Sequence, residues 1–134
     1  MAGNDIPIVC AEDCGNAPKK VVIRDFIAAL ARGDEEFLRG NVTDHVRRDI
    51  VGRQSIVGAD AFLRHALEES GRPISEVRIH NIITHGNVGA ADGMIVTDEG
   101  RIAFCEVFRF GSFAKHARIK EITSYIIPLP SEDA

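Results

Sequence analysis

The segment Arg101–Phe110, RIAFCEVFRF, constrains the fold more than any other part of the chain, because its apolar residues alternate with a period of two. That period predicts a β-strand with two different faces. One face carries Ile102, Phe104, Glu106, Phe108 and Phe110, and the other carries Arg101, Ala103, Cys105, Val107 and Arg109. A half-buried strand normally turns its acids toward water, whereas Glu106 shares a face with phenyl rings. Glu106 is therefore either a defect at a sheet edge or an acid that projects into a pocket.

Length and charge indicate one globular domain. The chain has 134 residues, and we expect an N-terminal arm at 1–15, a single domain at 16–130 and a C-terminal tail at 131–134. The net charge of −4 does not favour nucleic acid or an anionic membrane surface as a partner. No apolar run approaches the roughly 20 residues of a membrane span, and the first residues do not resemble a signal peptide. Three cysteines fit a reducing environment, so we expect a cytoplasmic protein.

The first half of the chain carries helix signals. A stripe of apolar residues at helical spacing follows Pro18, and capping residues and glycines bound the segments that we predict as helices. The predicted helices run from a cap at Asn16 to Gly33, from a cap at Asp34 to Gly40, and from a cap at Asp60 to Gly71. Between the second and third helices, the segment from His45 to Val51 is predicted to be a strand. The short apolar piece from Ile6 to Val9 is compatible with an added strand, an arm across a partner or disorder.

The second half of the chain is predicted to be a sheet. Its apolar segments, separated by glycines and turn residues, predict four long strands at Glu76–His85, Val88–Thr97, Arg101–Phe110 and Ala117–Ile127. Helices followed by a strand meander predict an α+β fold, with three helices packed on one face of a curved antiparallel sheet. A sheet that curls over a helix forms a cone, and we expect a pocket at its open end.

Several local segments, taken in this order, resemble the nuclear-transport-factor-2-like (NTF2-like) superfamily, a cystatin-like fold. The resemblance rests on FIAALARGDEEFL, HVRRDIVGRQSIVGADAF and FCEVFRF, which run from Phe26 to Phe110. Its nearer branch is the SnoaL-like and ketosteroid-isomerase-like proteins. The superfamily hosts isomerases, cyclases, hydrolases and binding domains, so the resemblance implies the fold more strongly than an activity. It also implies a homodimer that pairs through the outer face of the sheet, and Ala103, Cys105 and Val107 make that face apolar enough to need covering.

The resemblance implies two catalytic carboxyl groups. The general base of ketosteroid isomerases precedes a Val-Gly pair, where this chain has Asp49, and their protonated acid precedes a Phe-Arg-Phe segment, where it has Glu106. The family's tyrosine on the first helix corresponds to Phe26, so that hydroxyl is absent. The loss of one such donor typically lowers the rate on the order of 100-fold, which argues against steroid isomerisation itself. Two acids in unequal surroundings can still divide the roles of base and hydrogen-bond donor.

Other side chains are expected around the same pocket. Alternation places Phe104 and Phe108 beside Glu106, and the resemblance adds Phe26 from the first helix and Ile122, Ser124 and Ile126 from the last strand. The alternative interpretation is structural. Asp49 would end a strand in solvent, and Glu106 would pair with Arg47, Arg48 or Arg109.

The remaining residues carry weaker signals. His80 and His85 alternate to opposite faces of one strand and cannot chelate one metal together, although one of them could face the pocket. Cys10 and Cys14 form a C-x3-C without a second pair, which favours a packed arm over a disulfide or a metal site. We expect neither a metal nor a cofactor.

The sequence leaves two classes of function open. The first is the binding of a small, apolar, oxygen-bearing organic molecule in the cone, with isomerisation or cyclisation by carboxylate acid–base chemistry if the protein is an enzyme. The second is a non-catalytic ligand-binding or dimerisation module. An epoxide-hydrolase-like site would need an arginine between two acids, and Arg109 lies on the wrong face of its strand to provide it.

Overall fold

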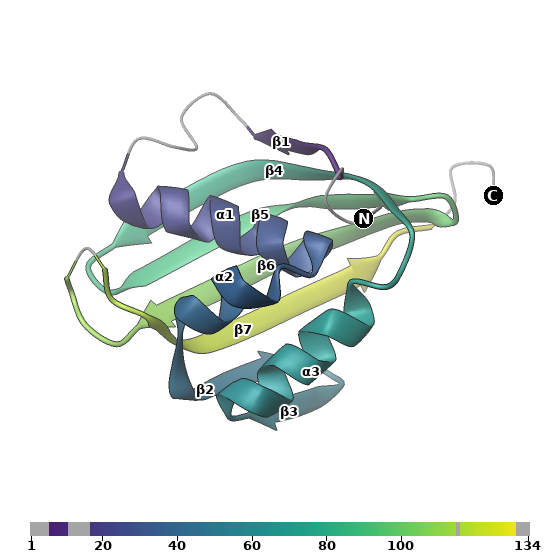
Figure 1. Ribbon diagram of the computed structural model, residues 1–134. Coiled ribbons are helices and arrows are strands. Elements are labelled where there is room, and N and C mark those ends of the chain that lie inside the picture. The colour runs from purple at the N-terminus through teal and green to yellow at the C-terminus, as the bar shows by residue number, and fades with distance from the viewer. Residues whose placement is uncertain (1–5, 11–16, 115, 131–134) are drawn as a thin grey trace.

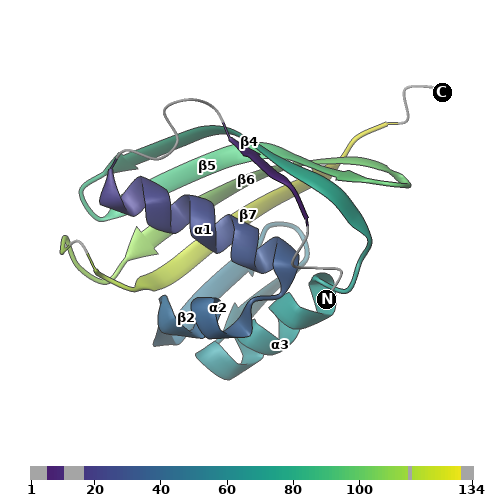
Figure 2. The same ribbon diagram turned by 45° about the horizontal axis from the view of Figure 1, so that its top comes forward.

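In the part of the chain that the structure describes, three helices lie on one side of a curved, unclosed sheet (Figure 1). A computed structural model describes residues 6–10, 17–114 and 116–130. The helices are α1 (Pro18–Arg32), α2 (Glu35–Gly40) and α3 (Ala59–Glu69). Figure 2 shows all three on the same side of the sheet, with α1 across its long strands and α3 next to β2. The α+β architecture is as predicted, and no helix over these residues is long and apolar enough to cross a membrane.

The predicted boundary between the first two helices is confirmed in detail. Gly33 adopts the left-handed conformation, with φ at 71°, and ends α1. The side chain of Asp34 then accepts a hydrogen bond from the Phe37 amide and caps α2. The prediction of the third cap is wrong: Gly58 is the N-cap of α3, and Asp60 lies in the first turn. The N-cap of α1 is Ala17, and the predicted cap Asn16 lies outside the described residues.

Within the described residues, the sheet has seven strands in the order β1-β4-β5-β6-β7-β2-β3. Their bounds are β1 (Ile8–Cys10), β2 (Val42–Ile50), β3 (Gln54–Val57), β4 (Ile74–His85), β5 (Val88–Thr97), β6 (Gly100–Phe110) and β7 (Ile119–Pro128). The four long strands β4 to β7 pair antiparallel, as expected. The prediction of a wholly antiparallel sheet is wrong, because β1 pairs parallel with β4 and β2 pairs parallel with β7. Both parallel pairs join segments that are far apart in the chain, which is the connection that parallel pairing requires.

Two short strands extend the sheet at its edges. Of the three alternatives for the N-terminal apolar piece, the structure shows the added strand, because β1 pairs with β4. Arg32 of α1 donates hydrogen bonds to the carbonyl of Ile6, just before this strand. Cys10 at the end of β1 is disulfide-bonded, contrary to the expectation of a simple packed arm. Cys14 lies outside the described residues. β3, which pairs with β2, is not predicted by the sequence pattern, because its segment QSIV carries a single buried side chain, Ile56.

The solid part of the core lies between α1, α3 and the C-terminal part of β6. The ring of Phe26 on α1 stacks on Phe62 of α3, with centroids 6.0 Å apart, and meets Phe108 of β6 edge-on at 5.7 Å. All three rings are fully buried. Aromatic pairs in such arrangements add about 0.5–1.5 kcal/mol to the stability gained from their burial. This cluster fixes the distance between the helices and the sheet, and thereby the width of the space beside it.

Candidate functional site

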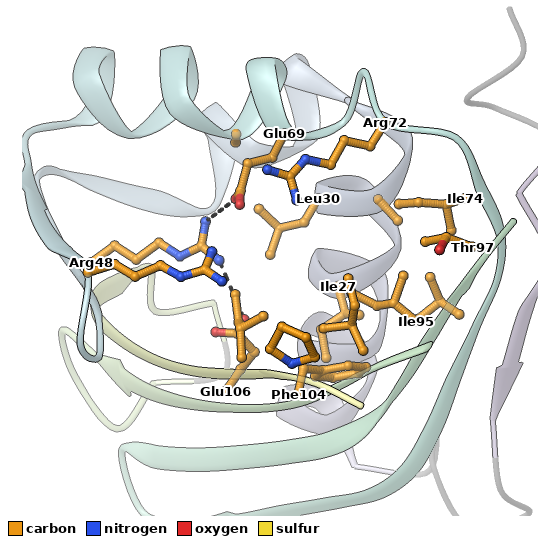
Figure 3. Close-up of a pocket in the computed structure, with 17 residues that line it drawn as sticks. Ile27, Leu30, Arg48, Glu69, Arg72, Ile74, Ile95, Thr97, Phe104 and Glu106 are labelled. Atoms are coloured by element: carbon orange, nitrogen blue, oxygen red, sulfur yellow. Dashed lines mark hydrogen bonds and ion pairs between the residues drawn. The ribbon is translucent and has the colours of Figure 1, made fainter. Parts of the chain in front are cut away.

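A pocket opens beside the aromatic cluster, between α1, α3 and the concave face of the sheet (Figure 3). Its volume is about 170 Å³. Most of its wall is aliphatic or aromatic, made by Ile27, Leu30, Ala31, Ala66, Ile74, Val77, Ile95, Ile102, Phe104, Ile126 and Pro128. The polar side chains in the wall are Arg48, Arg53, Glu69, Arg72, Thr97 and Glu106. An apolar pocket with a few convergent polar groups is the usual form of a small-molecule site.

Glu106 lies in the wall of this pocket, as the alternation of β6 predicts. Its side chain is buried, and the residue retains 5% of its accessible surface. The hydroxyl of Ser124, on the neighbouring strand β7, donates a hydrogen bond to its Oε2 atom. Burial raises the pKa of Glu106 above its ordinary value, although Arg48 and the Ser124 hydroxyl act in the opposite direction. Burial thus makes Glu106 a weaker acid than a glutamate in water.

Arg48 is the centre of the polar cluster. It alternates with Val46 and Ile50 on the inner face of β2 and is almost fully buried. Its Nη2 atom lies 3.5 Å from Glu106 Oε1, and its Nη1 atom lies 3.3 Å from Glu69 Oε1. Figure 3 shows the guanidinium group between the two carboxyl groups. The structure therefore contains an arginine bridging two acids.

Ser124 ties the two sides of this cluster together. Its hydroxyl accepts a hydrogen bond of 3.0 Å from Nε of Arg48 while it donates to Glu106. Ser124 is itself fully buried, and it pairs directly with Glu106 across the β6–β7 ladder. A buried network of hydrogen bonds of this kind fixes the orientation of its members. Arg48 and Glu106 are consequently held at one place in the pocket wall.

Glu69, at the C-terminal end of α3, is the more exposed of the two acids. Its side chain retains 29% of its accessible surface, compared with 6% for the side chain of Glu106. The Nδ1 atom of His65, one turn earlier on α3, lies 3.4 Å from Glu69 Oε1. Nε2 of the same ring lies 3.2 Å from the side-chain nitrogen of Gln54 on β3. Nδ1 is buried and forms no hydrogen bond with a described residue.

The predicted pocket residues separate into three groups. Phe104 and Ile126 line the pocket together with Glu106. Ser124 lies behind the wall and supports the acid. The other three are buried in the solid core and are not among the residues that line this pocket: Phe26, Phe108 and Ile122.

Asp49, the predicted base, is not brought to Glu106. It follows Arg48 on β2, so its side chain projects from the other face of the strand. There it accepts hydrogen bonds from the Ser55 hydroxyl on β3 and from Nε of Arg47, 3.2 Å away. The hydrogen bond from Ser55 is the main reason why the pKa of Asp49 is lowered. Among the described residues, the second acid of the pocket is Glu69 and not Asp49.

Arg48, which the structural interpretation named as a possible partner of Glu106, does pair with that acid, and its inward position carries a signal in the sequence. The alternation of Val46, Arg48 and Ile50 places Arg48 on an apolar face, by the same reasoning that singles out Glu106. Glu69 carries no comparable signal, because its approach to Arg48 depends on how α3 crosses the sheet.

The histidines on β4 do not belong to this site. His80 and His85 are both exposed, and neither is among the described residues that line the pocket. An irregularity in the β4–β5 pairing between Ile79 and Asn81 interrupts the alternation that would assign them to opposite faces. Across residues 6–10, 17–114 and 116–130, no group of three or more His, Cys, Asp or Glu side chains is placed to hold a metal ion.

Comparison with known proteins gives structural neighbours only. No protein-family model matches the sequence, and a search of curated proteins finds no significant match. An NTF2-like protein of unknown function from Cytophaga hutchinsonii has 23% identity and a TM-score of 0.61, covering 80% of this chain and 97% of its own. An NTF2-like protein of unknown function from Burkholderia xenovorans has 15% identity and a TM-score of 0.71, covering 85% and 86%. An epoxide hydrolase of the LEH-like type from M. tuberculosis has 21% identity and a TM-score of 0.60, covering 79% and 80%. At these identities the likeness concerns the fold alone.

Proposed function

We propose that this chain, which has the NTF2-like fold, binds a small and mainly apolar organic molecule through one oxygen-bearing group. The observation that carries the proposal is a buried carboxyl group, Glu106, paired with Arg48 in the wall of a mainly apolar pocket. A carbonyl, hydroxyl or ether oxygen placed there would meet the Arg48 guanidinium and the Glu106 carboxyl group, both of which can donate hydrogen bonds. The body of the molecule would replace water against the aliphatic wall.

The volume of the pocket limits the size of the ligand. Pockets for drug-sized molecules begin at roughly 300 Å³, and a cavity of about 150 Å³ in another protein accepts benzene. At about 170 Å³, this pocket matches a single substituted ring better than a steroid. The SnoaL-like and ketosteroid-isomerase-like proteins therefore provide a chemical analogy, not a substrate.

The chemistry that we propose is cofactor-free proton transfer next to a carbonyl group. Glu106, in its protonated form, would donate a hydrogen bond to the carbonyl oxygen as negative charge develops there. Glu69, the more exposed acid, would remove the proton from the neighbouring carbon and return it at the far end of the unsaturated system. Two carboxyl groups in unequal surroundings commonly divide these roles.

A second activity is supported by the position of Arg48 between two acids. Opening of an epoxide by water needs an acid for the ring oxygen and a base for the water. Glu106 would give its proton to the oxygen as the carbon–oxygen bond breaks, and Glu69 would take a proton from the water that attaches to carbon. The LEH-like epoxide hydrolase among the structural neighbours makes this activity the first alternative to test. A ligand-binding module without turnover is the remaining alternative.

The test uses two small probes and a matched pair of variants. Cyclohex-3-enone should bind in an NMR titration and isomerise to the conjugated enone, whereas 1,2-epoxycyclohexane should yield the diol if the second activity is correct. Ile126→Phe, which fills the pocket, should weaken binding about tenfold, and Ile127→Phe, on the exposed outer face, should not. Glu106→Gln should retain binding and lose turnover. Equal binding by wild type and Ile126→Phe, or no binding to wild type, would contradict the proposal.

A homodimer through the outer face of the sheet is part of this proposal. That face carries exposed Ile83, Tyr125 and Ile127, with 66%, 44% and 58% of their surface accessible. A shallow, largely apolar groove runs between them, which a second copy of the sheet could cover. Ile83→Lys combined with Ile127→Lys should give a monomer in light scattering coupled to gel filtration. A wild-type protein that remains monomeric at high concentration would refute the dimer.

A further inference from the structure

The mouth of the pocket holds two arginine side chains that the proposed chemistry does not use. Arg53 lies in the turn between β2 and β3, and Arg72 lies in the connection between α3 and β4. Both backbones are fixed by turn hydrogen bonds: the Arg53 amide donates to the Ile50 carbonyl at 2.9 Å, and the Arg72 amide donates to the Glu69 carbonyl at 3.2 Å. Their side chains are exposed and reach the pocket from two different connections of the chain. Two anchored cations thus border one opening.

Neither guanidinium group has a partner in the part of the chain that the structure describes. Arg48 is held by two carboxyl groups, whereas Arg53 and Arg72 form no ion pair or side-chain hydrogen bond with any described residue. Figure 3 shows Arg72 beside Glu69 with its guanidinium group turned toward the pocket. Guanidinium groups bind carboxylates through two parallel hydrogen bonds, and both donors here remain available for that.

The charges of the wall also favour an anion at the mouth. Three arginines and two glutamates line the pocket, so one positive charge is left over even if both carboxyl groups are ionised. The surplus is at the mouth, because Arg48 is already paired with Glu69 and Glu106. An anionic group deep in the pocket would meet the Glu106 carboxyl group and lose its hydration. At the mouth, the same group would keep part of its hydration and gain two cations.

An adjoining polar pocket marks the same place. It shares Arg53, Glu69 and Arg72 with the apolar pocket and is completed by Ile50, Gln54, His65 and Glu68. The two arginines therefore stand at the boundary between an apolar and a polar space. Glu68, on the polar side, would repel an anion and keep it close to the two guanidinium groups.

From this arrangement we infer that the ligand is a small apolar carboxylic acid. Its carboxylate is bound by Arg53 and Arg72 at the mouth, its apolar body fills the pocket, and its remaining oxygen function faces Glu106. This inference rests on the proposed function and adds the chemical class of the ligand. The two arginines select the acid over a neutral molecule of the same shape.

The experiment compares cyclohexanecarboxylate with cyclohexanecarboxamide, which have the same ring and differ in charge. Both are titrated by ligand-observed NMR at neutral pH and low salt, with wild type, Arg53→Gln/Arg72→Gln and Arg64→Gln. Arg64, on α3, is the matched control, because it is exposed and unpaired among the described residues and lines neither pocket. Wild type should bind the carboxylate roughly five- to tenfold more tightly than the amide. The double variant should lose that preference, Arg64→Gln should keep it, and added salt should reduce it.

The outcomes separate this inference from the proposed function. Equal binding of the two probes to wild type, or a preference that survives in the double variant, would overturn the carboxylate assignment and leave the pocket as a binding site. Failure of both probes to bind would overturn the assignment and the proposed ligand binding together.

Discussion

The two ends of the inner face of β6 share one sequence pattern and have opposite packing. At Phe108 the space above the sheet is solid, since the ring is fully buried and touches Phe26 of α1. At Phe104, four residues earlier, the ring lines an open pocket. The residue opposite Phe108 on β5 is Gly89, where a Cβ atom would lie 2.5 Å from Cδ1 of Ile23 on α1. Helix α1 therefore presses directly on the sheet at one end of the strand and not at the other.

This difference shows what alternation does and does not determine. The period of two decides which side chains face inward, and it does so equally well at both ends of β6. Whether an inward side chain meets a helix or a hollow depends on the route of α1 and α3 across the sheet. A buried acid is tolerated at Glu106 because it is paired with Arg48 at the hollow end, where a pocket separates the helices from the sheet.

Truncation of the two phenyl rings, Phe108 and Phe104, should lower the stability of the protein by clearly different amounts. Phe108→Ala should destabilise the protein by about 3–5 kcal/mol, because it opens a cavity in a packed cluster. Phe104→Ala should cost less, about 2 kcal/mol, because it only enlarges an existing pocket. Urea unfolding of both variants measures the difference in their free energies of unfolding, and the comparison is valid when the m-values equal that of wild type. Equal losses would mean that the hollow end is packed as tightly as the solid end.

At the hollow end, replacement of Arg48 should lower the stability of the protein more than any other single substitution considered. Arg48→Met leaves the buried Glu106 carboxyl group without its cation, which typically costs roughly 3 kcal/mol or more. The loss should be smaller in acid, where Glu106 is protonated. Denaturant unfolding of Arg48→Met, Glu106→Gln and the double variant forms a thermodynamic cycle. The double variant should recover much of the loss, and strict additivity of the two single changes would contradict a coupled pair.

The contrast between Arg48 and Asp49 shows which features of the site can be predicted from the sequence. Periodicity correctly predicts the strand and the inward Glu106, and the glycine and capping residues correctly predict the helix boundary at Gly33 and Asp34, because each follows from local geometry. The same periodicity implies that Arg48 faces inward, but the family resemblance favours Asp49 instead. Glu69 could not be predicted, because its distance to Arg48 is set by the packing of α3, which no short segment encodes.

Glu106→Gln should change the pH dependence of stability. Because burial raises the pKa of Glu106 in the folded state, the folded protein holds this proton more tightly than the unfolded chain. The associated stability is fully present below the ordinary glutamate pKa of about 4.3 and is lost as the pH rises through the folded pKa. Glu106→Gln should remove that decline. Above the folded pKa, the variant should gain about 1.4 kcal/mol for each pH unit by which the folded pKa exceeds the ordinary one.

Unfolding midpoints of wild type and Glu106→Gln, measured from about pH 4 to about pH 9, test this prediction, because that range spans the titration of a buried glutamate. Parallel profiles for the two proteins would place the acid in water.

Asp49→Asn should have the smallest effect, and it is the sharpest control for the pocket. Asp49 adjoins Arg48 in the chain, yet its side chain lies on the opposite face of β2, where it accepts hydrogen bonds from Arg47 and from Ser55 of β3. The substitution removes a charge from the surface and leaves the network of Arg48, Glu69 and Glu106 intact. Binding of cyclohex-3-enone and any turnover should therefore equal wild type, whereas Glu69→Gln should abolish turnover. The reverse result, with Asp49→Asn inactive and Glu69→Gln active, would mean that the resemblance to ketosteroid isomerases located the base better than the geometry does.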